Sequence, residues 1–201
     1  IGWASAEVRE PFLELVDRGV INTVQLDIKD ESGVIGYDSQ VPLARQVGAV
    51  AGVYDVRAAL EQLHARKVRV IGRIVAFRDP VLDTWAWRND HRDWVIQDTA
   101  GEALSAYGGF TNYADPAVRQ YNIDLAVEAA DLGFDEILWD YVRRPEGDPT
   151  EMTVPGLTGT GRTTGDHIVE FLDQARAQLR PRGVYQGASV FGIAATRPEN
   201  I

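Results

Sequence analysis

The stretch from Gly133 to Gly147, GFDEILWDYVRRPEG, carries the strongest structural signal in the chain. Its first half is apolar and of strand length, and it follows a segment with helical spacing. A near-continuous apolar run after an amphipathic helix is typical of a buried strand in a parallel sheet. The run stops at Asp140, which would therefore lie at the carboxyl end of the strand, where parallel α/β proteins carry their chemistry. Asp140 is thus the first candidate for a functional residue.

A structural interpretation of Asp140 is that it caps a loop or pairs with Arg143 or Arg144. An isolated aspartate at a strand end more often has such a role. Recurrence of the pattern favours a functional role, because Asp27 lies near the end of another apolar segment and Asp79 follows a third. Parallel strands end at the same edge of a sheet, so these acidic side chains would gather there.

Strand and helix patterns alternate along the chain without a hairpin signal, which predicts a parallel α/β protein. The expected strands are Ile1–Trp3 (the end of a first strand), Asn22–Ile28, Val68–Phe77, the run before Asp140, and Val184–Ile193. The expected helices begin at the N-cap residues Ser5, Asp55, Asp115 (before Pro116) and Asp166. We expect connecting segments over 81–113 and over 144–165. The first is rich in tryptophan and contains a turn at Asp98–Gly101.

Polar groups at the ends of several strands are typical of a (β/α)8 TIM barrel. The alternative is a doubly wound sheet that binds a phosphate ligand, but the turn after Asp27 lacks the usual glycines. A complete barrel has eight strands in about 250 residues, and we count about five strand–helix units. We therefore expect 1–201 to be a single (β/α)-barrel domain of catalytic type, truncated at both ends, rather than an open half-barrel with exposed edges.

The composition excludes several classes of function. The net charge is −10 and no run of basic residues occurs, which argues against nucleic acid as a partner. The chain has no cysteine, and no stretch resembles a signal peptide or a membrane span. A targeting signal outside this sequence would place the protein outside the cytoplasm or at the cell surface. His64, His91 and His167 lack the spacing of metal ligands, so we expect no obligatory metal and no cofactor.

One loop resembles a nucleotide-binding motif. Gly156–Thr163, GLTGTGRT, has the spacing of a phosphate-binding loop, but arginine replaces the required lysine. No convincing strand precedes it, so we interpret it as a loop over the barrel mouth.

Several segments together resemble the glycoside hydrolase family DUF4015. They are NTVQLDIKD at 22–30, GRIVAFRDP at 72–80, YADP at 113–116 and GFDEILWDYVRRP at 133–145, with a weaker match at Val190–Gly192. The resemblance covers nearly the whole chain in the right order. It implies a TIM barrel related to retaining glycosidases, with a nucleophilic carboxylate at the end of the fourth strand. Asp140 has that place if Ile1–Trp3 ends the first strand.

The sequence departs from the family pattern at two positions. Ser189 stands where the family tends to have an acidic residue before Val-Phe-Gly, so an acid/base carboxylate from that strand is in doubt. Arg144 stands where an aromatic residue is usual.

Hydrolysis of a glycosidic bond uses two carboxyl groups, one as nucleophile or base and the other as proton donor. We predict Asp140 as the nucleophile and Asp27 as its catalytic partner, with Asp79 or an acid outside this sequence as other donors. Asp27 could instead form an ion pair with Lys29, Arg73 or Arg143. The candidate substrate-binding residues are Lys29, Arg73, Asp79, Tyr113, Tyr141 and Arg143.

The predicted function is hydrolysis of a polysaccharide or a cell-envelope glycan. The alternative is a barrel that binds carbohydrate without cleaving it, which Ser189 favours. Trp139, Tyr141, Tyr113 and Phe77 could stack on sugar rings, although strand aromatics more often belong to the core. We expect Trp139 to pack inside and Tyr141, past the strand end, to be free to touch a ligand.

Overall fold

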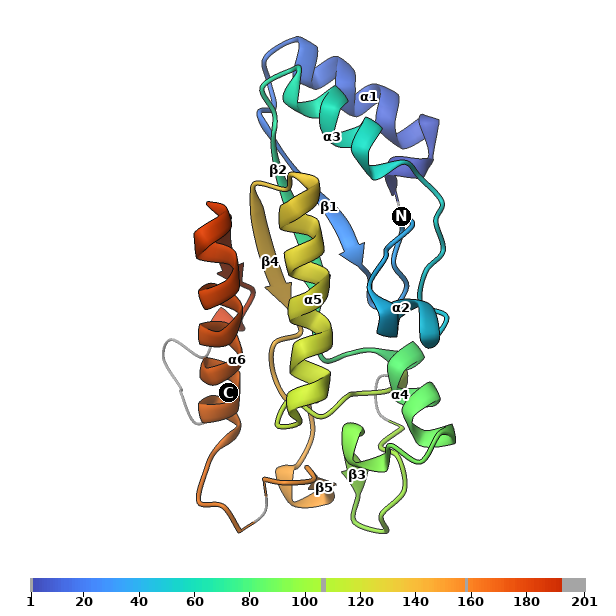
Figure 1. The fold of residues 1–201 in the computed structure, drawn as a ribbon, viewed down its shortest axis with the longest axis vertical. Helices are drawn as coiled ribbons and strands as arrows, with labels where there is room; N and C mark the ends of the chain where they lie inside the picture. Colours follow the sequence, from blue (N-terminus) through green and yellow to red (C-terminus); the bar gives the residue numbers. More distant parts are fainter. Residues whose placement is uncertain (1, 106–107, 158, 193–201) are drawn as a thin grey trace.

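The computed structural model describes residues 2–105, 108–157 and 159–192 (Figure 1). Its centre is a four-stranded sheet in the order β1-β2-β4-β6, and every neighbouring pair is parallel. The strands are β1 (Thr23–Lys29), β2 (Arg69–Val75), β4 (Glu136–Asp140) and β6 (Tyr185–Ala188). The predicted parallel α/β class is therefore confirmed. The short strands β3 (Gln97–Asp98) and β5 (Met152–Thr153) form an antiparallel pair beyond the carboxyl ends of the main strands (Figure 1).

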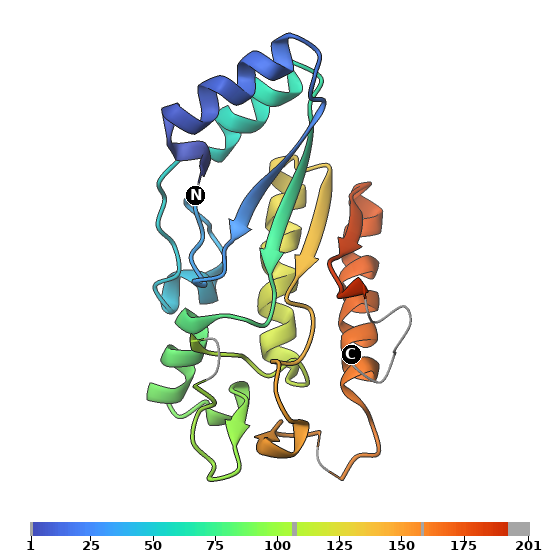
Figure 2. The same ribbon diagram turned by 180° about the vertical axis from the view of Figure 1, so that it is seen from behind.

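The α-helices of the described residues are α1 (Ala6–Asp17), α2 (Pro42–Gln46), α3 (Val56–His64), α4 (Pro80–Arg88), α5 (Pro116–Leu132) and α6 (Thr164–Leu179). Helices α5 and α6 lie along one side of the sheet, and α4 lies beyond the carboxyl ends of the strands (Figure 1). Short 3-10 helices cover Gly2–Ala4, Arg92–Trp94, Pro149–Glu151 and Arg180–Arg182. Seen from behind in Figure 2, the strands lie in front of α5. No helix in the described ranges is long and apolar enough to cross a bilayer.

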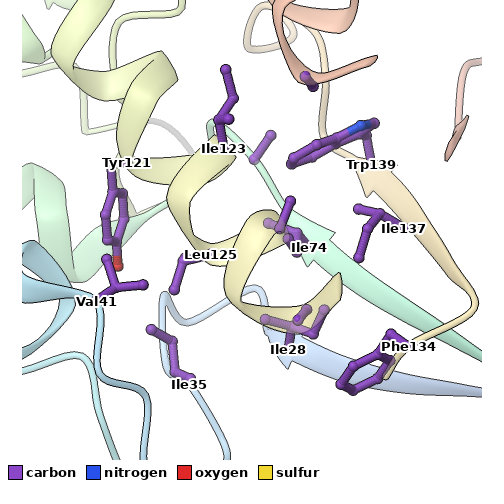
Figure 3. Close-up of a cluster of buried hydrophobic side chains, with 14 of the residues drawn as sticks. Ile28, Ile35, Val41, Ile74, Tyr121, Ile123, Leu125, Phe134, Ile137 and Trp139 are labelled. Atoms are coloured by element: carbon purple, nitrogen blue, oxygen red, sulfur yellow. The ribbon is translucent and has the colours of Figure 1, made fainter. Parts of the chain in front are cut away.

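The two faces of the sheet differ because side chains alternate along a strand. Ile28, Ile74, Ile137 and Trp139 are buried and form the core beneath α5 (Figure 3). Gly72 lies between Ile28 and Phe134, where a Cβ atom would overlap the Ile28 side chain, so the close approach of β1 and β2 requires glycine. Asp27, Arg73 and Asp140 lie on the opposite face, whereas Lys29 at the end of β1 is buried on the side of the helices.

Two of the four predicted helix starts are confirmed by side-chain caps, and Ser5 is the N-cap residue of α1 without a side-chain hydrogen bond. Asp55 accepts a hydrogen bond from the Ala58 N–H, and Asp115 accepts from the Ala117 and Val118 N–H groups. Gly133 ends α5 in the left-handed conformation with φ 113°, as glycine allows at this position. The turn at Asp98 is also present, because its carboxylate accepts from the Ala100 N–H.

Several predicted boundaries were wrong. Gly2–Ala4 is a 3-10 helix and not a strand end, and Ile1 lies outside the described residues. The cap of α6 is Thr163, with Asp166 completing a capping box from the first turn. The last strand ends at Ala188, and Ile193 lies outside the described residues. The segment expected as a connection after β2 begins with helix α4, capped by Asp79.

Candidate functional site

Arg73, in the middle of β2, binds carboxylates from two other segments of the chain. Its Nε and Nη2 donate to Asp140 Oδ2 at 2.9 and 2.7 Å. Its Nη1 donates to Asp27 Oδ1 at 3.1 Å, and its Nη2 also donates to Glu31 Oε1 at 2.9 Å. The Arg73 side chain is only 12% exposed, so these charge-assisted hydrogen bonds are partly shielded from water. We call Asp27, Glu31 and Asp140 around Arg73 the carboxylate cluster.

Sequence analysis predicted part of this cluster. Asp27 pairs with Arg73 across the β1–β2 ladder, and Asp140 pairs with Val75 at the end of β4. The structure thus brings Asp27, Arg73 and Asp140 together on the face away from the helices. It also bears out the interpretation of Asp27 as a member of an ion pair, with Arg73 as the partner.

Glu31 is the member that sequence analysis missed. It lies two residues past the end of β1, and the signal that could have found it is an acidic residue directly after a strand end. The hydrogen bond from Arg73 is the main cause that lowers the pKa of Glu31. Glu31 is therefore poorly suited to hold a proton for donation at neutral pH.

The backbone after β4 fixes the orientation of Asp140. Its Oδ1 accepts from the Tyr141 N–H at 2.8 Å. Tyr141 has φ 49°, in the left-handed region, which costs a residue with a side chain about 1–2 kcal/mol. Such strain is often found at functional sites, where the surrounding structure holds it in place. Asp140 is therefore held on both oxygens, by Arg73 and by a strained turn.

Tyr141 lies between two arginine side chains at the strand end. The guanidinium groups of Arg78 and Arg143 lie 5.4 and 4.9 Å from the centre of its ring. Arg78 Nη1 also donates to the Tyr141 hydroxyl at 3.2 Å. Arg143 donates to the Arg144 carbonyl and approaches Glu146. The ion pair of Asp140 is thus with Arg73 rather than with Arg143 or Arg144.

Lys29 and Asp79 lie in the core and not on the open face. Both side chains are 0% exposed, and Lys29 Nζ lies 2.6 Å from Asp79 Oδ2. Lys29 Nζ also donates to Asn122 Oδ1 at 2.9 Å and faces the Tyr121 ring. The register of β1 shifts between Asp27 and Lys29, which turns Lys29 toward the helices. In this position neither residue offers an atom to a ligand.

Three of the four aromatic residues predicted to stack on sugar rings are core residues, namely Phe77, Tyr113 and Trp139. Tyr113 is buried, donates or accepts a hydrogen bond at Thr164 Oγ1, and packs its ring edge-on against Phe77. Trp139 is buried against Phe171, as expected. Within the described part of the chain, no group of three or more His, Cys, Asp and Glu side chains is arranged to hold a metal ion.

A further carboxyl group lies one turn beyond Asp79 in α4. Asp83 is almost fully buried, and its Oδ2 has no hydrogen-bond partner among the described residues. Burial, and then the negative charge of Asp79, raise the pKa of Asp83 from 3.8 to about 7. A backbone hydrogen bond at Phe110 lowers this pKa by a smaller amount.

This raised pKa predicts a pH dependence of stability. The folded state keeps the Asp83 proton between about pH 4 and 7, whereas the unfolded state loses it. The stabilisation from the protonated form is therefore complete below pH 4 and is lost as the pH rises to 7. The free energy of unfolding of Asp83→Asn minus that of the parent should increase as the pH rises from 5 to 7.5. Urea denaturation measures both values. Parallel pH profiles for the two proteins would contradict this prediction.

Comparisons with known proteins identify a family and a solved structure that match this chain over nearly its whole length. The family model DUF4015, described as "Putative glycosyl hydrolase domain", matches residues 1–201. No curated protein matches the chain. Among solved structures, a hypothetical protein from Ruminiclostridium thermocellum is 33% identical, with a TM-score of 0.83, over 96% of this chain and 95% of that one.

Two glycosidases share the fold at lower identity. An exo-β-N-acetylglucosaminidase from Vibrio harveyi is 15% identical, with a TM-score of 0.64, over 92% of this chain and 33% of that one. An α-galactosidase from Lactobacillus brevis is 17% identical, with a TM-score of 0.59, over 94% of this chain and 26% of that one. The chain therefore spans a third or less of these two enzymes, and the likeness concerns the fold alone.

Proposed function

This chain belongs to DUF4015, a family of glycosyl hydrolase domains, and we propose that it hydrolyses glycosidic bonds in a polysaccharide or a cell-envelope glycan. The observation that carries the proposal is the carboxylate cluster, in which one guanidinium group holds Asp27, Glu31 and Asp140 at the carboxyl ends of parallel strands.

We further propose that the sheet is part of a (β/α)8 barrel and that residues 1–201 form one domain. The fold is shared over more than nine-tenths of the chain with parts of two glycosidases. Helices α5 and α6 lie along one face of the sheet (Figures 1 and 2). The opposite face, which carries Asp27, Arg73 and Asp140, would line the interior and the mouth of such a barrel.

The spacing of the carboxylates suits two-carboxylate chemistry. Hydrogen bonds of about 3 Å from a guanidinium group about 2 Å across keep the bound oxygens of Asp27 and Asp140 within roughly 8 Å of each other. Retaining enzymes have carboxyl groups about 5–5.5 Å apart, and inverting enzymes about 6.5–9.5 Å apart. Asp27 and Asp140 are therefore close enough to each other for this reaction class.

We assign the roles of the two carboxyl groups as the sequence predicts them. Asp140 is the nucleophile: an oxygen of its carboxylate attacks the anomeric carbon, and the bond to the leaving-group oxygen breaks. Asp27 supplies the proton to that oxygen, for which its ion pair with Arg73 must open, and then removes one from the water that releases the sugar. Arg73 orients both groups. Asp79 is unsuited to this donor role because it is buried against Lys29.

The alternative function is carbohydrate binding without cleavage. Ser189 is exposed just past β6, and its N–H donates to the Trp139 carbonyl, so no carboxylate comes from this position. If the reaction needs an acid there, the cluster can bind a glycan but cannot cleave it.

A screen of the protein against oligosaccharides of varied linkage separates these functions. Binding is measured by calorimetry, and cleavage by the release of reducing ends. We expect both binding and release for at least one glycan. Binding without release would favour the alternative, and neither binding nor release with any glycan would overturn both proposals.

A further inference from the structure

The guanidinium group of Arg143 lies among three aromatic rings just past the end of β4. Its central carbon is 4.9 Å from the centre of the Tyr141 ring, 4.7 Å from that of Phe191 and 5.8 Å from that of Phe110. The π face of a ring attracts a cation without offering it an oxygen acceptor. The rings come from three different segments of the chain, so they hold the cation in place and leave its N–H groups for other partners.

Most of these N–H groups have no hydrogen-bond partner in the part of the chain that the structure describes. A guanidinium group has five N–H donors. Arg143 Nη1 donates to the Arg144 carbonyl at 3.0 Å. Its Nη2 lies 3.5 Å from Oε1 of Glu146, a side chain that is itself 54% exposed. The Arg143 side chain is 18% exposed, so a ligand can reach the donors that remain.

The neighbouring arginines at this end of the sheet are committed to other groups. Arg73 binds the three carboxylates of the carboxylate cluster. Arg144 donates to two backbone carbonyl groups of its own loop. Arg78 donates to the Tyr141 hydroxyl. Arg143 is therefore the arginine best placed to receive an anionic group from a ligand.

Arg143 is also close to the proposed nucleophile. It follows Asp140 by three residues, so their Cα atoms are at most about 11 Å apart. Tyr141, whose N–H binds Asp140, contacts Arg143 through its ring. Both residues lie at the carboxyl end of β4, and this end of a (β/α)8 barrel stays open as the mouth of the site. One glycan can therefore contact both residues.

We infer that the glycan carries a carboxylate group, as a uronic acid does, and that Arg143 binds this group through paired N–H donors. The inference rests on the proposed function and adds a substrate class and a specificity-determining residue to it. The planar guanidinium fork matches the two oxygens of a carboxylate, which an ammonium group cannot do. The net charge of −10 repels anions in general, so the recognition depends on this one side chain.

The test compares two uronates with the neutral sugars that lack only the charge. D-Glucuronate and D-glucose, and D-galacturonate and D-galactose, are titrated by calorimetry into the parent, Arg143→Gln and Arg143→Lys. We expect the parent to bind at least one uronate about tenfold or more tightly than its neutral partner. Arg143→Gln should weaken uronate binding by roughly ten- to hundredfold, since charge-assisted hydrogen bonds are lost, and should not weaken hexose binding.

Two further variants separate recognition from folding and from net charge. Arg143→Lys keeps a cation among the rings but loses the planar fork, so it should melt close to the parent and still bind the uronate more weakly. Arg176→Gln removes an exposed arginine of α6 that pairs with Asp173. It changes the net charge by the same amount as Arg143→Gln and should keep the parent's preference for the uronate.

Several results would overturn the inference. They are the failure of both uronates to bind, equal binding of uronate and hexose by the parent, and equal uronate affinity of Arg143→Gln and Arg176→Gln. Tighter binding of D-glucose 6-phosphate than of either uronate would also overturn it, in favour of a phosphorylated glycan. The proposed function is tested separately by the oligosaccharide screen, because cleavage of a neutral glycan without any uronate preference would leave a hydrolase of neutral glycans.

Discussion

Asp140→Asn is expected to lower kcat for a glycan that the protein cleaves by roughly 10³–10⁵-fold, the range found when a nucleophile or its base is removed. Asparagine has nearly the same size, but its amide cannot attack the anomeric carbon. The dissociation constant for the glycan should stay within about threefold, because the shape of the site is kept. Initial rates at saturating glycan and calorimetric titration measure the two quantities.

The fold should survive this change, which makes the result interpretable. The substituted asparagine would keep an oxygen for the Tyr141 N–H, and Arg73 would keep its hydrogen bonds to Asp27 and Glu31. Asp173→Asn is the matched control, since Asp173 is an exposed aspartate on α6 that pairs with Arg176. If Asp140→Asn cleaves the glycan at the rate of this control, Asp140 is not the nucleophile and its role is structural.

The parts of the site that sequence could predict depend on local pattern and strand order. The apolar run before Asp140 has the composition of a buried strand wherever it lies in the fold. Parallel strands end at the same edge of a sheet, so Asp27, Asp79 and Asp140 were expected to gather there. The structure brings Asp27 and Asp140 together around Arg73, whereas Asp79 is buried in the core.

The parts that sequence missed depend on contacts between distant segments. Lys29 lies in the core because the register shifts between Asp27 and Lys29, and this shift belongs to the pairing of β1 with β2. Glu31 joins the cluster because the Arg73 side chain reaches it from another strand. The sequence around Lys29 and Glu31 gives no sign of either contact.

Helix α4 was missed for a different reason. Asp79-Pro80 is the same start signal as Asp115-Pro116, which was recognised. The inward face of α4 includes the buried polar side chain of Asp83, and its tryptophans are only half-buried. The apolar periodicity that identifies a helix is therefore weak there.

Lys29→Met should lower the free energy of unfolding by about 3–5 kcal/mol, the usual result when one partner of a buried ion pair is removed. Methionine fills similar space, so the main effect is electrostatic. Asp79 would stay in the core without its partner and close enough to Asp83 to raise the pKa of that group. Burial lowers the pKa of Lys29 although the charge of Asp79 acts in the opposite direction, so the core disfavours charge at this position. Urea denaturation at pH 7 measures the loss.

The double variant Lys29→Met/Asp79→Asn distinguishes electrostatics from packing. It removes both charges, while the asparagine oxygen can still accept the Leu82 N–H that Asp79 Oδ1 now caps. We therefore expect it to recover at least about 1 kcal/mol relative to the sum of the single changes. Arg182→Met, which breaks an exposed pair with Asp131, should cost no more than about 1 kcal/mol. If Lys29→Met cost as little as Arg182→Met, the buried pair would contribute nothing special to stability. A large loss would instead show that the buried charge pair beneath the helices contributes to the stability of the fold.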